Sequence, residues 1–166
     1  MEKSIWRRAR MHAEMFLARH GLLREISFEL GKQKINSPVV DGVFCTPNES
    51  FMIDILSRIL PIKSGVFLDV GVNLGQTLIV LKSIDINREY VGFEPNSICN
   101  YYSSKLIAAN DFPRCTLMPV GLSNHNGLIA LSYYSRSDVD SSALIVANFR
   151  PNQTVIKQRF VPICTY

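Results

Sequence analysis

The chain has 166 residues, enough for one domain of ordinary size. Apolar residues make up 47% of it and charged residues 19%, which excludes disordered, collagen-like and coiled-coil proteins. The net charge of +4 allows an anionic ligand, but the clustered charge of a nucleic-acid-binding protein is missing, so no nucleic-acid partner is expected. No apolar stretch reaches the roughly 20 residues of a membrane-spanning helix, and none follows the basic N-terminus as in a secretory signal.

The cysteines contain no Cys-x-x-Cys pair, which argues against a zinc ribbon and against a redox pair. They are Cys45, Cys99, Cys115 and Cys164. We therefore expect inert thiols, no metal site and a reducing compartment, which favours a cytoplasmic location.

The first 44 residues are predicted to form a basic, helical extension ahead of a domain over residues 45–166. Residues 4–31 are rich in Arg, Ala, Met, Leu and Glu, which favour helices, and Gly21 is placed to end a first helix. Residues 1–34 carry eight basic and four acidic side chains. A solvated helix face explains this charge better than a helix that binds a membrane or a partner.

A further helix is expected to open at Pro47-Asn48-Glu49 and to end at Pro61. Phe51, Ile55 and Ile59 recur at four-residue spacing, so an apolar face builds up along this segment as far as Leu60.

Residues 66–120 are predicted to form a β-α-β-α-β unit. The strands are expected at 65–71, 90–95 and 116–120, and the helices at 75–83 and 98–109. Asn96 and Ser97 are suited to cap the second of these helices. Short connections in this order favour a parallel sheet with packed helices, so the chain is assigned to the α/β class with a Rossmann-like sheet. The apolar run 67–70 is expected to be buried on both faces.

The pattern changes after residue 120. Ser123–Gly127 has the composition of a turn, and strands are expected at 128–134 and 159–165. Pro162 places the last strand near a sheet edge, because proline cannot donate to a ladder.

The candidate site lies where the first strand of the unit meets its helix, in Asp69-Val70-Gly71-Val72-Asn73-Leu74-Gly75. Gly71 lets the backbone turn and approach a ligand, and Gly75 lets the helix begin close to the strand. Glu94 ends the next strand, 19 residues after Gly75, where its carboxylate can accept hydrogen bonds from both hydroxyls of a ribose. These features together predict a site for an adenosine-type cofactor.

Two cofactor classes compete for this site. A nicotinamide or flavin dinucleotide calls for G-x-G-x-x-G, but Asn73 and Gln76 stand where the second and third glycines should be. S-adenosylmethionine has no phosphate and tolerates this turn, so it is the favoured cofactor.

At these residues the chain resembles the FkbM family of class I S-adenosylmethionine-dependent methyltransferases. That family shows D-x-G-A-N-x-G and then E-P-N, and this chain has the first motif at 69–75 and the second at Glu94, Pro95 and Asn96. The run 120–127, which includes Ser123, resembles the family's A-L-S-x-x-x-G turn. Val72 replaces the usual alanine. The resemblance implies a Rossmann-like fold, S-adenosylmethionine as cofactor, and O-methylation of a small-molecule or glycan hydroxyl.

The resemblance also implies that the chain stops early. Family members continue into a helix and a strand that completes the sheet beside residues 66–70, and Val161–Tyr166 resembles the start of that stretch. We therefore expect a truncated methyltransferase domain with an unpaired edge at 66–70, possible self-association, and weak or absent methyl transfer.

Other interpretations stay open at this point. The alternative enzyme is a dinucleotide-dependent oxidoreductase, and the non-enzymatic alternative is a cofactor-binding remnant or interaction module. Asp69 is also suited to cap a helix, and Asn73 to hold its loop. No residue stands out as a general base: His125 is expected to be exposed, and Tyr101 and Tyr102 to serve packing or the surface.

Overall fold

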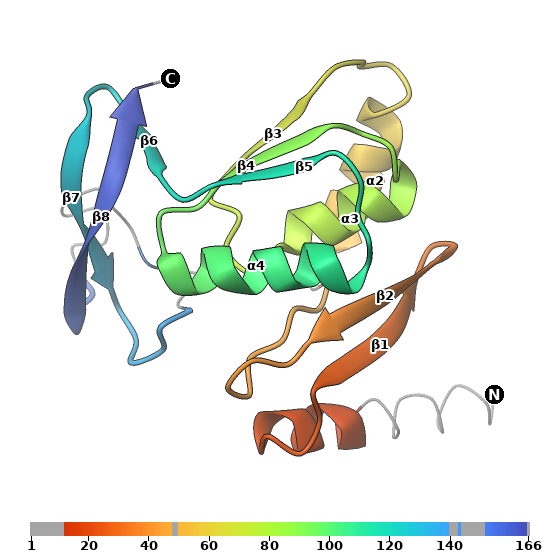
Figure 1. The fold of residues 1–166 in the computed structure, drawn as a ribbon, viewed down its shortest axis with the longest axis horizontal. Helices are drawn as coiled ribbons and strands as arrows, with labels where there is room; N and C mark the ends of the chain where they lie inside the picture. Colours follow the sequence, from red (N-terminus) through yellow and green to blue (C-terminus); the bar gives the residue numbers. More distant parts are fainter. Residues whose placement is uncertain (1–11, 48–49, 140–142, 144–151, 166) are drawn as a thin grey trace.

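A three-stranded parallel sheet organises the computed structural model, which describes residues 12–47, 50–139, 143 and 152–165 (Figure 1). Its order is β3-β4-β5, and two helices connect the strands. The elements are β3 (Phe67–Val70), α3 (Gln76–Ile84), β4 (Tyr90–Phe93), α4 (Ser97–Ala109) and β5 (Cys115–Met118). The predicted β-α-β-α-β unit and the α/β class are therefore confirmed.

Capping residues and buried apolar faces stabilise the helices of this unit. Asn96 caps α4, its side-chain Oδ1 accepting a hydrogen bond of 3.1 Å from the Ile98 N–H. Helix α2 (Ser50–Ile59) occupies the segment predicted for it. Leu56 of α2 packs with Leu78 and Leu81 of α3 in the core cluster of buried residues. Burial of these faces, rather than helix propensity alone, stabilises the short helices.

One face of the parallel sheet is uncovered, contrary to the expectation that 67–70 is buried on both faces. Leu68 and Val70 of β3 are 62% and 64% exposed, and Met118 of β5 is 39% exposed. Helices α3 and α4 lie on the opposite face (Figure 1), and no described element covers this one. Strand β3 is also an edge strand of the sheet, as predicted. Self-association through this surface stays a prediction.

The N-terminal segment contains a β-hairpin, so the prediction of helix across residues 22–31 is wrong. Residues 12–19 are helical, and strands β1 (Glu25–Leu30) and β2 (Gln33–Pro38) follow as an antiparallel pair. Buried Ile26 and Leu30 alternate with exposed glutamates along β1. This period of two buries one face of the strand and outweighs the helix propensity of Glu and Leu. Residues 1–11, with four of the basic side chains, lie outside the described residues.

The hairpin is held against α4 by two sets of hydrogen bonds. Asn36 and Asn110 form two hydrogen bonds with each other. The Asn36 main-chain N–H donates to Oδ1 of Asn110 at 2.7 Å, and Nδ2 of Asn110 donates to the Asn36 carbonyl at 2.7 Å. The buried Tyr102 hydroxyl donates to the Pro38 carbonyl at 2.8 Å and accepts from the Cys45 N–H at 2.7 Å. The boundary at residue 44 stays a prediction, but these contacts join the segments on either side of it to the same helix.

A second sheet follows the parallel one. It consists of β6 (Gly121–Ser123), β7 (Gly127–Tyr133) and β8 (Lys157–Thr165), in the order β6-β8-β7. Strand β8 is therefore central, and its expected place near a sheet edge is wrong. Proline is tolerated there because β6 pairs with β8 only from Ile163 onward, which leaves β7 as the neighbour of Pro162. Neither predicted strand covers the free edge of β3.

Candidate functional site

The turn after β3 is built from residues with left-handed backbone conformations. The φ angles of Gly71, Asn73 and Gly75 are 90°, 50° and 85°. A Cβ at Gly75 would lie 2.8 Å from Cδ2 of Leu106 on α4, so only glycine lets the helix begin this close. A Cβ at Gly71 would meet no atom within 4 Å, so open space lies over this part of the turn.

The Glu94 carboxylate ties this turn to the start of α4. Its Oε2 accepts a hydrogen bond of 2.7 Å from the Asn73 N–H, and its Oε1 accepts one of 2.8 Å from the Asn96 N–H. Only 7% of Glu94 is exposed, so its carboxylate does not simply end the strand in water. Each carboxylate oxygen keeps a second lone pair after these bonds. Glu94 is thus a fixed acceptor at the carboxyl end of β4.

Asp69 accepts a hydrogen bond from Tyr90 and does not cap a helix. The Tyr90 hydroxyl, on a fully buried side chain, donates to Oδ2 of Asp69 at 2.8 Å. The intervening Gly92 makes room, because a Cβ there would lie 2.8 Å from the Tyr90 ring and 2.5 Å from Val72. The N-cap of α3 is Gly75, which has no side chain to cap with.

Two carboxylates with raised pKa values therefore lie on neighbouring strands. Burial is the main cause of the raised pKa of Glu94, and the Asn96 and Asn73 amides oppose it. Burial also raises the pKa of Asp69, against the hydrogen bond from Tyr90. The charge of Asp69 adds to the shift at Glu94.

These shifts give the stability of the chain a pH dependence. A carboxyl group whose pKa is raised by folding binds a proton in the folded chain at pH values where the unfolded chain has lost it. The free energy of unfolding should therefore fall as pH rises from the ordinary 4.5 of glutamate through the raised pKa of Glu94. Urea unfolding at a series of pH values measures this slope. Glu94→Gln should make it shallower and leave the part due to Asp69; an unchanged slope would contradict the assignment.

Asn96 links Glu94 to the loop after β7. Its side-chain Nδ2 donates 2.7 Å to the Asp138 carbonyl, while its main-chain N–H donates to Glu94. The Asp138 carboxylate in turn binds Lys157 at 2.5 Å and Arg159 at 2.7 Å. The second sheet is thus tied to the first at the N-terminus of α4.

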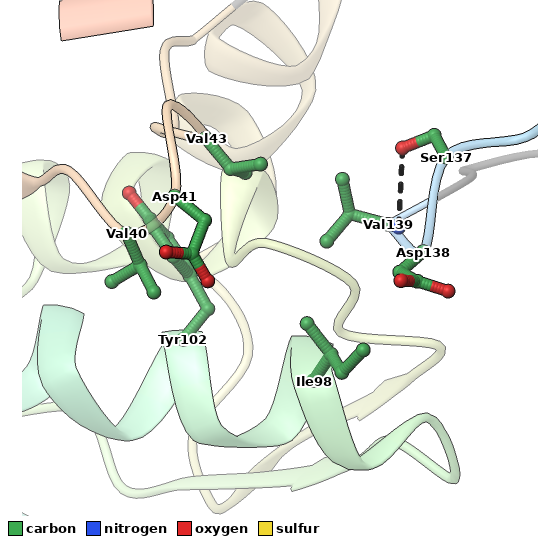
Figure 2. A pocket seen from close by; sticks show the side chains of 8 residues that line it. All are labelled: Val40, Asp41, Val43, Ile98, Tyr102, Ser137, Asp138 and Val139. Carbon is green, nitrogen blue, oxygen red and sulfur yellow. Dashed lines mark hydrogen bonds between the residues drawn. The ribbon is translucent and has the colours of Figure 1, made fainter. Parts of the chain in front are cut away.

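A pocket of about 280 Å³ lies beside this link. Figure 2 shows Val40, Asp41 and Val43 on one side of it and residues 137–139 on the other. From α4, Tyr102 lies beside Asp41, and Ile98 lies between the two sides. Half of its lining side chains are aliphatic, and its charged side chains are Asp41 and Asp138. The pocket adjoins the α4 N-terminus without including Glu94.

Most of the predicted site residues lie together. Gly71, Asn73, Gly75, Glu94 and Asn96 share hydrogen bonds or the turn itself, with Asp69 on the adjoining strand.

The remaining candidates lie toward the second sheet or away from the turn. Pro95 packs against Gly121, where a Cβ would lie 3.5 Å from the proline ring. Ser123 pairs with Thr165 in the second sheet, and its hydroxyl donates 3.4 Å to Asn124. His125 is exposed in the following turn, and Tyr101 is 51% exposed.

Sequence reasoning missed two residues, one at this site and one in the second sheet. The Cys99 thiol donates 3.4 Å to Oδ1 of Asn73, which holds the turn against α4. Tyr133 of β7 has no exposed surface, and its hydroxyl has no hydrogen-bond partner in the described part of the chain. The alternation of Ile129, Leu131 and Tyr133 in β7 marks an inward face, but it does not tell what that face meets.

The four cysteines are free, and burial raises the pKa of both Cys45 and Cys99 to about 12, so these two thiols are inert. Among the described residues, no three His, Cys, Asp or Glu side chains gather in a way that could hold a metal ion. The described helices include none with the length and apolar character needed to cross a membrane.

No protein-family model and no curated protein matches this chain. Any functional assignment therefore rests on the fold, the Glu94 site and the sequence motifs.

Proposed function

We propose that this chain binds S-adenosylmethionine in a Rossmann-like domain and serves as an FkbM-type methyltransferase. The observation that carries the proposal is the buried Glu94 carboxylate, held by the Asn73 and Asn96 amides beside a glycine turn at the carboxyl ends of parallel strands. Ligands of open α/β sheets bind at this end of the strands.

The residues present fit an adenosine-type cofactor. The space over Gly71 is open to a ligand group, and the free lone pairs of Glu94 can accept from ribose hydroxyls. The turn also favours a cofactor without a pyrophosphate. Asn73, with its left-handed backbone, and Gln76 stand where a dinucleotide site has glycines. When bound, S-adenosylmethionine supplies an activated methyl group, and the protein's part is to hold and orient it.

The acceptor is proposed to be a small-molecule or glycan hydroxyl, on the sequence resemblance alone. The alternatives are a dinucleotide-dependent oxidoreductase and a non-catalytic cofactor-binding module. A cytoplasmic location also stays a prediction.

Isothermal titration separates these proposals. We expect S-adenosylhomocysteine to bind the purified chain and NAD to give no heat, because the turn lacks the glycines that a pyrophosphate needs. Binding of NAD without binding of S-adenosylhomocysteine would favour the oxidoreductase. Binding of S-adenosylhomocysteine without transfer of labelled methyl to any hydroxyl acceptor would favour the non-catalytic module.

A further inference from the structure

The Tyr133 hydroxyl is a buried polar atom without a partner. The side chain has no exposed surface, and its oxygen makes no hydrogen bond with any residue that the structure describes. A buried hydroxyl left in this state costs stability that a phenylalanine of the same shape would not lose. Buried polar groups are rarely unsatisfied in folded proteins, so this atom calls for a partner.

The ring of Tyr133 is fixed in place by charged neighbours. Nζ of Lys157 lies 4.8 Å from the ring centre, and the Arg159 guanidinium lies 5.9 Å from it. Both cations bind the Asp138 carboxylate, which holds them over the ring. The hydroxyl therefore has a defined direction.

A continuous set of contacts joins Tyr133 to the Glu94 site. The Asp138 carbonyl accepts from the Asn96 side chain, and the Asn96 N–H donates to Glu94. Burial is the main cause of the raised pKa of the Tyr133 phenol, and the charge of Glu94 adds to it. The Asn96 side chain at the N-terminus of α4 and the two cations over the Tyr133 ring thus all contact Asp138.

We propose that Tyr133 is a second anchor of the Glu94 site and that its hydroxyl donates a hydrogen bond to the nucleoside part of the bound ligand. This inference rests on the proposed function. Burial raises the pKa of Tyr133, so the phenol keeps its proton and acts as a donor. Its counterpart is an acceptor oxygen or nitrogen of the nucleoside. Because the hydroxyl has no exposed surface, neighbouring side chains must shift as the ligand enters.

Tyr133→Phe tests the proposal, since it removes only the hydroxyl. Titration with S-adenosylhomocysteine should give a Kd about 3- to 10-fold weaker than that of the natural chain, the range expected for one neutral hydrogen bond. Titration with adenosine should show the same loss, which places the contact on the nucleoside. The free energy of unfolding without ligand should be unchanged or higher. Tyr101→Phe, which alters an exposed tyrosine of α4, should change neither quantity.

Each other outcome overturns the proposal. An unchanged Kd in Tyr133→Phe shows that the hydroxyl does not meet the ligand, while binding by the natural chain leaves the proposed function standing. A loss confined to S-adenosylhomocysteine moves the contact off the nucleoside. Lower stability or failure to fold in Tyr133→Phe means that the hydroxyl is already satisfied within the chain. If the natural chain binds neither ligand, the proposed function falls together with this inference.

Discussion

Replacing Lys82 with methionine should lower the free energy of unfolding by about 3 kcal/mol, the scale expected for hydrogen bonds from a buried charged group. Lys82 has no exposed surface. Its Nζ donates to the carbonyls of Ile86, Arg88 and Pro113 at 3.1, 2.7 and 2.6 Å. Methionine keeps the apolar stem but leaves these oxygens without their donor. The ammonium group thus holds the loop after α3 against the segment that leads into β5.

Chemical denaturation of both proteins measures this loss. Lys63→Met is the matched control, because Lys63 is exposed and an exposed substitution of this kind should stay within about 0.5 kcal/mol. Equal stability of Lys82→Met and the natural chain would show that water replaces the ammonium group without cost.

Glu94→Ala should weaken the binding of S-adenosylhomocysteine by about 1.5–3 kcal/mol, roughly 10- to 150-fold. The substitution removes the proposed acceptor of the ribose hydroxyls. It also frees the Asn73 and Asn96 amides, so the turn and the start of α4 lose the group that holds them in register. Isothermal titration measures the change in Kd.

Glu89→Ala provides the comparison for this variant. Glu89 directly precedes β4, at the opposite end of the strand from Glu94, and pairs with Arg114 at the surface. Its loss should leave the affinity unchanged. A folded Glu94→Ala protein with the Kd of the natural chain would reduce Glu94 to a structural brace between two loops.

The periodic segments could be predicted from the sequence because local signals and packing agree there. The apolar run before Asp69, the helix after Gly75 and the cap at Asn96 all appear where their residue types require. The site followed from the same logic, since strand ends of a parallel sheet meet at one edge.

The errors arose where the deciding contact is distant in sequence. In residues 25–30 a period of two, with Gly31 after it, competes with good helix formers, and packing of the hairpin on α4 decides the outcome. Pro162 shows that one hydrogen-bond donor is missing from the strand. It does not show which of the two neighbouring strands ends before reaching the proline, and here that strand is β6. The partners of Glu94 and the isolation of the Tyr133 hydroxyl depend on side-chain placement across two sheets, which no local pattern encodes.

The uncovered face of the β3-β4-β5 sheet also shapes the thermodynamics of the chain. Water already surrounds Leu68, Val70 and Met118 in the folded state, so unfolding adds little new apolar hydration at these side chains. Apolar hydration is the source of the positive heat capacity change, which is about 12–15 cal/mol/K per residue in ordinary domains. A smaller value here flattens the curve of stability against temperature, so that cooling and warming both change the free energy of unfolding less steeply than in a domain with both sheet faces covered.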